Sequence, residues 1–229
     1  MRKPVLVIIP AFNEERSIGK VVADVPKNLV REILVVDNGS EDNTSGAARD
    51  AGATVVKEER RGYGSACLRG IEYALSLEAR PDVIVFLDGD YSDYPDQMDR
   101  LLKPLEDGRY DLVIGSRKLG NPERGAMLPQ QVFGNWLATT LIRLLYDVKF
   151  TDLGPFRAIL FDNLLELDMK DTDYGWTVEM QVKAVKKGLR WTEVPVSYRK
   201  RIGVSKIAGT VSGTLKAGYK IIFTIFKYI

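Results

Sequence analysis

The stretch Val83-Ile84-Val85-Phe86-Leu87-Asp88-Gly89-Asp90 decides the fold. Its apolar residues follow one another without alternation, which suits a strand buried on both faces of a helix-covered parallel sheet. Two carboxylates separated by one glycine come directly after this run. The stretch therefore predicts an interior strand that ends in an acidic turn.

Other apolar runs of this kind recur along the first half of the chain. They lie at 5–9, 33–36 and 112–114, with a shorter run at 54–56. Helical patterns separate them, at 17–25, 44–51, 65–77 and 95–105. This strand–helix alternation predicts an α/β fold, a Rossmann-like single domain whose mostly parallel central sheet is flanked by helices.

The second half of the chain is less regular. A polar loop at 120–128 precedes, in order, an expected helix at 131–146, a strand at 156–160, a helix at 177–187, an extended segment at 190–196 and a final helix from Ile207. No linker or repeat divides the chain, so we expect one domain over residues 1–229. Within it, we expect a nucleotide half over 1–116, a variable half over 117–206 and an amphipathic helix over 207–229.

The composition excludes several classes of function. Among 229 residues, 33 Lys and Arg against 31 Asp and Glu leave a net charge of +2, so no global basic field points to a nucleic-acid partner. The chain has no histidine, which excludes Ser-His-Asp chemistry and imidazole metal ligands. Its single cysteine, Cys67, cannot form an intramolecular disulfide and favours a reducing, cytoplasmic setting.

The two ends of the chain bear on membrane contact. The apolar run at 5–9 is much shorter than the core of a signal peptide. The apolar residues at 221–226 are flanked by Lys216, Lys220 and Lys227, far short of the roughly 20 apolar residues that a spanning helix needs. We expect this end to rest peripherally on a membrane surface, with packing on the enzyme or in a homo-oligomer as the alternative.

Polar residues follow four of the strands, where ligands bind in open parallel sheets. The four stretches are Pro10-Ala11-Phe12-Asn13-Glu14-Glu15, Asp37-Asn38-Gly39-Ser40, Asp88-Gly89-Asp90 and Gly115-Ser116-Arg117. Each has an ordinary structural interpretation, since Asn13 and Ser40 are good helix N-caps and Gly39 suits a turn. Four at one sheet edge favour a binding site, and Asp88 with Asp90 can share a hard cation such as Mg²⁺ or Mn²⁺.

These residues resemble the inverting family 2 glycosyltransferases of the GT-A fold, especially the branch of dolichyl- and polyprenyl-phosphate mannosyl- and glucosyltransferases. The resemblance covers most of the chain and implies that 1–116 form a nucleotide-sugar half and 117–206 an acceptor half. Besides the strand ends, it rests on Arg61-Gly62-Tyr63-Gly64-Ser65-Ala66, Phe156-Arg157 and Arg201-Ile202-Gly203-Val204-Ser205-Lys206.

The resemblance implies a site for a UDP- or GDP-linked sugar. Asp90 would be the closer metal ligand, with Asp88 nearer the ribose or sugar, and the metal would bridge the diphosphate. The base and ribose of the donor would lie against the first two strand ends. A glycine loop around Gly62 and Gly64 and a late basic loop at 199–206 would reach the phosphates. The donor-binding residues implied are Pro10, Ala11, Asn13, Glu14, Asp37, Gly39, Ser40, Arg61, Gly64, Asp88, Gly89, Arg199, Arg201 and Lys206.

The acceptor decides which residues take part in the chemistry. A lipid phosphate is already an anion and needs no general base, and the resemblance implies that Arg117 binds it. A hydroxyl acceptor needs a carboxylate to take its proton, and Glu179 is the first candidate, with Asp152 second. The acceptor-binding residues implied are Ser116, Arg117, Asp152, Arg157 and Ser205.

The sequence departs from the lipid-phosphate branch in two places and leaves alternatives open. Residues 128–131 read Leu-Pro-Gln-Gln where further basic residues are expected, and residues 152–157 read Asp-Leu-Gly-Pro-Phe-Arg where a Ser-Gly-Phe-Arg-like stretch is expected. A hydroxyl acceptor and a non-catalytic nucleotide- or membrane-binding module therefore remain alternatives. A nucleotidyltransferase or a dehydrogenase would need a glycine-rich loop after the first strand, which this chain lacks.

Overall fold

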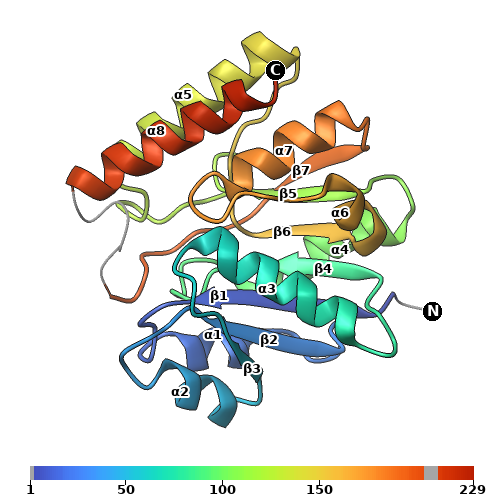
Figure 1. Ribbon diagram of the computed structural model, residues 1–229, viewed down its shortest axis with the longest axis vertical. Helices are drawn as coiled ribbons and strands as arrows, with labels where there is room; N and C mark the ends of the chain where they lie inside the picture. Colours follow the sequence, from blue (N-terminus) through green and yellow to red (C-terminus); the bar gives the residue numbers. More distant parts are fainter. Residues whose placement is uncertain (1–2, 204–210) are drawn as a thin grey trace.

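Strands and helices alternate through most of the chain, as Figure 1 shows for the computed structural model, which describes residues 3–203 and 211–229. The elements are β1 (Val5–Ala11), α1 (Ile18–Asp24), β2 (Glu32–Asp37), α2 (Thr44–Asp50), β3 (Thr54–Lys57), α3 (Tyr63–Ser76), β4 (Val83–Phe86), η1 (Pro95–Gln97), α4 (Met98–Glu106), β5 (Leu112–Ser116), α5 (Pro129–Tyr146), β6 (Arg157–Leu160), α6 (Phe161–Leu167), α7 (Trp176–Lys186), β7 (Trp191–Pro195) and α8 (Val211–Lys227).

The seven strands form one sheet in the order β3-β2-β1-β4-β6-β5-β7. All neighbouring pairs are parallel except those of β6, which runs antiparallel to β4 and β5. The predicted α/β class with a mostly parallel sheet is confirmed. Strands β6 and β7, from the expected acceptor half, enter the same sheet as the strands of the nucleotide-sugar half.

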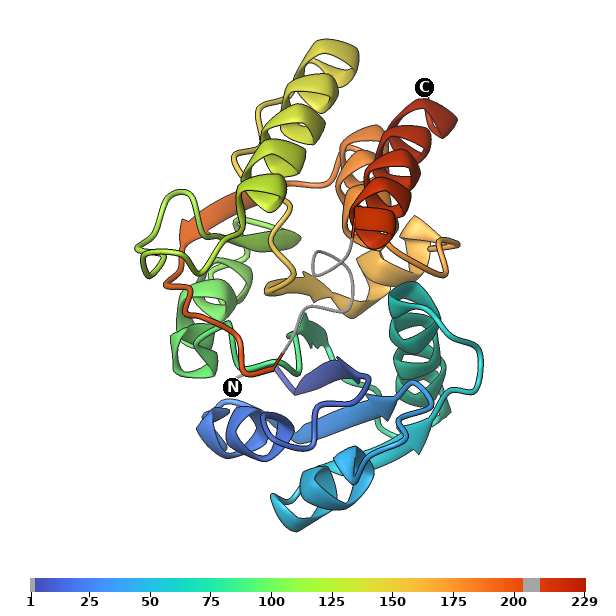
Figure 2. The same ribbon diagram turned by 90° about the vertical axis from the view of Figure 1, so that its left-hand side faces the viewer.

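Two apolar cores cover the two faces of this sheet. Leu6 and Ile8 of β1 face the core formed with α3, α5, α6, α7 and α8, whereas Val5 and Val7 face the core formed with α1, α2 and α4. Figure 2 shows the helices on both sides of the sheet. The uninterrupted apolar run of β1 is explained by this burial on both faces.

The structure differs from the sequence prediction in a few elements. The helix α6 was not expected, although Phe161, Leu164 and Leu167 are its buried residues. The final helix was expected from Ile207, and the described helix α8 begins at Val211, because residues 204–210 lie outside the described part of the chain. Within the described ranges, no helix combines the length and apolarity that crossing a membrane requires.

Candidate active site

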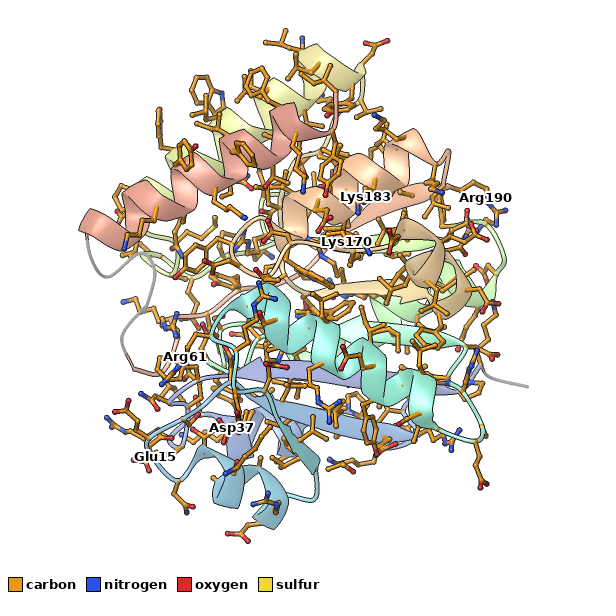
Figure 3. The ribbon with its side chains drawn as sticks, in the orientation of Figure 1. Glu15, Asp37, Arg61, Lys170, Lys183 and Arg190 are labelled. Carbon is orange, nitrogen blue, oxygen red and sulfur yellow. The ribbon has the colours of Figure 1, made fainter. Side chains whose placement is uncertain are left out.

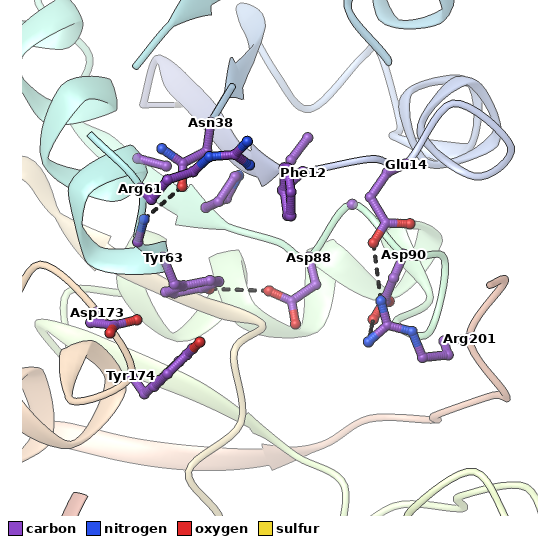
Figure 4. Close-up of a pocket in the computed structure, with 15 residues that line it drawn as sticks. Phe12, Glu14, Asn38, Arg61, Tyr63, Asp88, Asp90, Asp173, Tyr174 and Arg201 are labelled. Carbon is purple, nitrogen blue, oxygen red and sulfur yellow. Dashed lines mark hydrogen bonds and ion pairs between the residues drawn. The ribbon is translucent and has the colours of Figure 1, made fainter. Parts of the chain in front are cut away.

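A cavity of about 310 Å³ lies at the carboxyl ends of β1, β2 and β4 (Figure 4). Parallel strands bring their carboxyl ends to one edge, so residues far apart in sequence meet there. Its walls come from the strand ends, the start of α3, the connection from α6 to α7 and the arm after β7. They are Pro10, Ala11, Phe12, Glu14, Asn38, Arg61, Gly62, Tyr63, Ala66, Asp88, Gly89, Asp90, Asp173, Tyr174 and Arg201.

The acidic turn after β4 supplies two carboxylates to the cavity. The hydroxyl of Tyr63 donates a hydrogen bond to Oδ1 of Asp88 at 3.1 Å, and the backbone N–H of Ser92 donates to Oδ1 of Asp90 at 2.9 Å. Burial, followed by the charge of Asp90, raises the pKa of Asp88 to about 7. Two carboxylates this close in a buried site favour a neighbouring positive charge.

Arg201 supplies a positive charge from the segment that follows β7, residues 196–203, which we call the arm. Its guanidinium nitrogens lie 3.0 Å from Oε1 of Glu14 and 3.1 Å from Oδ2 of Asp90, and Figure 4 shows this bridge. Backbone hydrogen bonds hold the arm in place, from the N–H of Ile202 to the carbonyl of Asp90 and from the N–H of Arg199 to the carbonyl of Ser92. Arg201 thus closes the acidic side of the cavity.

The other predicted cations of this arm are placed differently. The Nε of Arg199 donates to the carbonyl of Tyr91 at 2.6 Å, and its guanidinium lies 3.3 Å from the centre of the Tyr91 ring, so that Arg199 is not among the cavity residues. Arg199 therefore anchors the arm beside the site. Lys206, and Ser205 among the acceptor residues, lie outside the described residues.

The glycine loop, residues 60–64 at the start of α3, forms one wall of the cavity because its backbone packs closely on residues 171–172. The side chain of Asn38 holds the loop, accepting from the N–H of Gly62 at 2.8 Å and donating to the carbonyl of Arg60 at 2.8 Å. A Cβ at Gly62 or Gly64 would come within 2.1 Å of the carbonyl oxygen of Thr172 or Asp171, respectively. Both glycines are therefore needed for the loop to pack against the segment between α6 and α7.

Arg61 reaches the cavity from the same loop. Its guanidinium stacks on the ring of Phe12, 4.0 Å from the ring centre. Gly39 lies beneath it, where an added Cβ would be 3.4 Å from the Arg61 Nε. The placement is compatible with a cation near the donor phosphates.

The residues that follow β1 and β2 divide into two groups. Pro10, Ala11 and Glu14 line the cavity, as do Gly89 and the two carboxylates of the acidic turn. Asn13, Asp37, Gly39, Ser40 and Gly64 are not among the lining residues. Direct donor contacts by this second group stay a prediction.

Loop hydrogen bonds explain where some of these side chains point. The backbone N–H of Asn13 donates to Oγ of Ser40 at 3.0 Å. Asp37, labelled in Figure 3, accepts from the backbone N–H of Ser40 at 2.8 Å and from the hydroxyl of Ser45. Burial works against ionisation of Asp37, but these hydrogen bonds outweigh it and lower its pKa.

Arg117 and Asp152 form a buried ion pair outside the cavity wall. Nε and Nη2 of Arg117 donate to the two carboxylate oxygens at 2.8 and 2.6 Å, and its backbone N–H donates to Oδ2 at 2.8 Å. Desolvation opposes the charge of Arg117, but the charge of Asp152 prevails and raises the Arg117 pKa. Ser116 lies beside the pair, with its Oγ 2.7 Å from Oγ1 of Thr151. Asp152 thus fixes the orientation of Arg117.

Two predicted site residues, Arg157 and Glu179, make structural contacts away from the cavity wall. Arg157 is fully buried, and its guanidinium donates to the backbone carbonyls of Leu153, Gly154 and Thr177. The acceptor contact predicted for Arg157 stays a prediction, and the contacts that the structure shows are structural, because the guanidinium lies in the interior and holds neighbouring loops together.

Glu179 is also fully buried, and it is not among the cavity residues. It accepts hydrogen bonds from the backbone N–H groups of Lys170 and Asp171 and from the Tyr228 hydroxyl, and it pairs with Lys183 at 2.7 Å. Figure 3 shows Lys170 and Lys183 well away from Asp37 and Arg61. The general-base role that the sequence predicts for Glu179 stays a prediction, since its carboxylate is held by donors of α7, of the loop before α7 and of Tyr228 near the C-terminus.

Three functional candidates were missed by sequence reasoning. Asp173 and Tyr174 line the cavity from the segment between α6 and α7, and burial raises the pKa of Asp173. Asp93 is buried, and neither of its carboxylate oxygens has a hydrogen-bond partner within the described part of the chain. Burial and the charges of Asp88 and Asp90 raise the Asp93 pKa well above its usual range. The acidic runs 88–93 and 171–173 are the sequence signals that could have found these residues.

The acidic turn fits a divalent cation. Asp88 and Asp90 provide the oxygen donors that Mg²⁺ and Mn²⁺ prefer, and burial, followed by the charge of Asp90, raises the pKa of Asp88. Over residues 3–203 and 211–229, no group of three or more acidic, histidine or cysteine side chains converges on one metal position. The chain would therefore hold a cation through these two carboxylates, with the remaining ligands supplied by substrate and water.

Comparisons with known proteins identify the family of the chain. The model of the family "Glycosyl transferase family 2" matches residues 6–167. An uncharacterized glycosyltransferase of Mycobacterium tuberculosis is 34% identical over 215 residues, which cover 93% of this chain and 94% of that protein. The undecaprenyl-phosphate mannosyltransferase of Micrococcus luteus is 31% identical over 224 residues, covering 91% of this chain and 89% of that protein.

A solved structure resembles the whole fold. Glucosyl-3-phosphoglycerate synthase from Mycobacterium tuberculosis, crystallised with Mn²⁺, uridine diphosphate and phosphoglyceric acid, matches with a TM-score of 0.78 at 21% identity. The match covers 99% of this chain and 78% of that one. At this identity the likeness shows a shared fold.

Proposed function

Because the chain belongs to glycosyltransferase family 2, we propose that it transfers a sugar from a UDP- or GDP-linked donor to a polyprenyl phosphate, with inversion and with a divalent cation. The observation that carries this proposal is the cavity at the strand ends, where Asp88 and Asp90 face the cationic side chain of Arg201. It combines cation-binding and anion-binding groups, as a metal–diphosphate complex requires.

The chemistry is a single in-line displacement. A phosphate oxygen of the acceptor forms a bond to the anomeric carbon as the bond from that carbon to the donor diphosphate breaks. Mg²⁺ or Mn²⁺, when bound by Asp88 and Asp90, supplies positive charge that stabilises the departing diphosphate. Arg201, and Arg61 on the opposite wall, add positive charge that is already oriented before the reaction.

The contacts of the two bases that the sequence suggests support a phosphate acceptor, which needs no general base. Of the two bases that the sequence suggests, Glu179 lies outside the cavity and Asp152 is held by Arg117. A phosphate oxygen needs neither of them. The name of the Micrococcus luteus relative supports the same acceptor class and mannose as the sugar. We place the acceptor phosphate near Arg117, whose bonds to Asp152 use Nε and Nη2 and not Nη1.

One observation favours a second acceptor class. Asp173 lines the cavity and has a raised pKa, which are properties of a general base for a hydroxyl acceptor. Under this alternative, Asp173→Asn would abolish transfer to the hydroxyl compound and leave donor binding intact. Under the lipid-phosphate proposal, the same substitution leaves most of the turnover in place.

The test is release of nucleoside diphosphate from a panel of UDP- and GDP-sugars, with Mg²⁺ or Mn²⁺ and with or without polyprenyl phosphate. We expect lipid phosphate to stimulate release, and Asp90→Asn to reduce it by about 100-fold or more. Asp96→Asn is the matched control, since Asp96 is an exposed carboxylate on the nearby η1. Full activity of Asp90→Asn, or no release with any donor, contradicts the proposal.

A further inference from the structure

Two neighbouring helices, α5 and α8, lie at one end of the molecule (Figures 1 and 2). Both helices expose large apolar side chains. We call this surface the α5–α8 face and define it by Phe133, Trp136 and Leu144 of α5 and Tyr219, Phe223 and Phe226 of α8. Each of these residues exposes between 48% and 72% of its surface. Clusters of this kind are uncommon on the free surface of a soluble protein and indicate a binding surface.

The exposed side chains are not needed for the core. Helix α5 buries Ala138 and Ile142, and helix α8 buries Ile225. The hydroxyl of Tyr146 donates to the carbonyl of Ile225 at 2.6 Å and ties the two helices together. Each helix therefore packs through one side and presents its aromatic side outward.

The charges on these helices identify the partner. The helices are 18 and 17 residues long and contain none of the chain's 31 acidic residues. Lys216 and Lys227 of α8 are exposed. At about 100° per residue, positions 216, 220 and 227 lie along one edge of the stripe formed by 219, 223 and 226. An aromatic stripe bordered by lysines is complementary to an anionic lipid surface.

The same charges argue against a second copy of the chain as the partner. Pairing this face with itself would bring together two sets of lysines, and neither helix carries a carboxylate to neutralise them. A bilayer of anionic lipids provides that neutralisation. It also accommodates Trp and Tyr side chains, which prefer the membrane–water interface.

The face is connected to the cavity through α8. Lys220 pairs with Asp171 at 3.1 Å, in the segment that brings Asp173 and Tyr174 into the cavity wall. We propose that the α5–α8 face docks on an anionic membrane surface and so presents the cavity to an acceptor embedded in the bilayer. This inference rests on the proposed function for the acceptor, whereas the membrane contact itself can be measured without turnover.

The first experiment measures flotation of the full chain with vesicles of phosphatidylcholine alone or mixed with phosphatidylglycerol. We expect binding to the anionic vesicles, and a loss of about tenfold or more for the double variant Trp136→Ser/Phe223→Ser. Lys216→Gln/Lys227→Gln should weaken anionic binding by about fivefold per lysine and remove the difference between the two lipids. The control is Leu75→Ser, an exposed leucine of α3, which should bind as the unaltered chain does.

Tryptophan fluorescence locates the contact. Of the three tryptophans, Trp136 is exposed, Trp176 is buried, and Trp191 is partly buried against Phe150. Lipid contact should therefore shift Trp136 emission to the blue and allow quenching by brominated lipid. Trp136→Phe should lose both effects while still binding vesicles. The inference is overturned if the Trp136→Ser/Phe223→Ser variant binds vesicles as well as the unaltered chain does. It is also overturned if the unaltered chain does not bind vesicles and instead forms concentration-dependent dimers that this variant abolishes.

Turnover separates this inference from the proposed function. With a short-chain, water-soluble polyprenyl phosphate, the double variant should release nucleoside diphosphate as fast as the unaltered chain. With the acceptor embedded in vesicles, its rate should fall in proportion to its lost binding. If the chain binds vesicles but releases no nucleoside diphosphate with either acceptor, membrane docking by the α5–α8 face is supported and the proposed function is contradicted. If the double variant loses the same fraction of its turnover with both acceptors, docking by this face is contradicted.

Discussion

Glu179 illustrates, at the scale of single residues, how one carboxylate pattern fits both a catalytic and a structural role. The sequence Trp-Thr-Val-Glu-Met-Gln at 176–181 shows an acidic residue among apolar ones, which is also the pattern of a catalytic base in a cavity. Only the structure reveals its donors, from Lys183, Tyr228 and the backbone of residues 170–171. Lys183 lies one helical turn away, but the backbone donors come from the loop before α7 and Tyr228 comes from the end of the chain, so no pattern within the helix could have predicted that the carboxylate is fully occupied.

We predict that Glu179→Gln lowers the free energy of unfolding by about 3 kcal/mol, because it breaks a buried ion pair and leaves Lys183 without its partner. Donor turnover at a temperature where the variant is folded should change less than twofold. Thermal unfolding and nucleoside diphosphate release measure the two effects separately. A stable variant with strongly reduced turnover would restore the catalytic role.

At the scale of elements, the sequence predicted the elements whose signal is local. The uninterrupted apolar runs of β1, β2, β4 and β5 correspond to strands buried on both faces, and the residues that follow three of them line the cavity. The direction of β6 could not be predicted, because an apolar run at 156–160 looks the same in either direction. Its direction is set by the connections that place it between β4 and β5.

The cavity wall also contains residues that sequence order alone could not bring together. Arg201 was expected near the phosphates because the stretch 201–206 resembles a family motif. Its contacts with Glu14 and Asp90, however, depend on the arm crossing the acidic turn. Asp173 and Tyr174 enter from a connection with no strand before it. The rule that ligands bind at the ends of strands therefore predicts the side of the cavity formed after β1, β2 and β4. It does not predict the side formed by Asp173, Tyr174 and Arg201.

The glycine loop gives a prediction at this scale. Gly64→Ala should weaken donor binding about tenfold and destabilise the fold by about 2 kcal/mol, because the new Cβ would meet a backbone oxygen and push α3 away from the facing segment. Gly134→Ala is the matched control in α5, where nothing lies within 4 Å of an added Cβ. It should stabilise the chain by about 0.5–1 kcal/mol. Calorimetry of donor binding and thermal unfolding distinguish the two variants.

At the scale of the whole molecule, stability should depend on pH in two opposite ways. Asp88, with a pKa of about 7, binds its proton more tightly in the folded chain, so its contribution to stability is complete below its unfolded pKa and is lost as the pH rises towards 7. Asp37 and Glu179 have lowered pKa values in the folded state, so their contributions are lost as the pH falls below about 4.

We therefore predict that, without divalent cations, the free energy of unfolding is greatest near pH 5 and declines on either side. Adding Mg²⁺ or Mn²⁺ should stabilise the chain more at pH 8 than at pH 5, because cations compete with protons for the carboxylates of the acidic turn. Denaturant unfolding across this range measures both effects. In Asp88→Asn, the decline between pH 5 and pH 8 should become smaller, and an unchanged decline would assign it to other groups.

The bridge that Arg201 makes between Glu14 and Asp90 has a consequence for how ligands assemble. In the empty site, the guanidinium serves as an internal counter-ion, and a metal ion must compete with it for Asp90. Once displaced, the same guanidinium is available to the diphosphate. Metal and nucleotide should therefore bind with positive cooperativity, each raising the affinity of the other by the same factor.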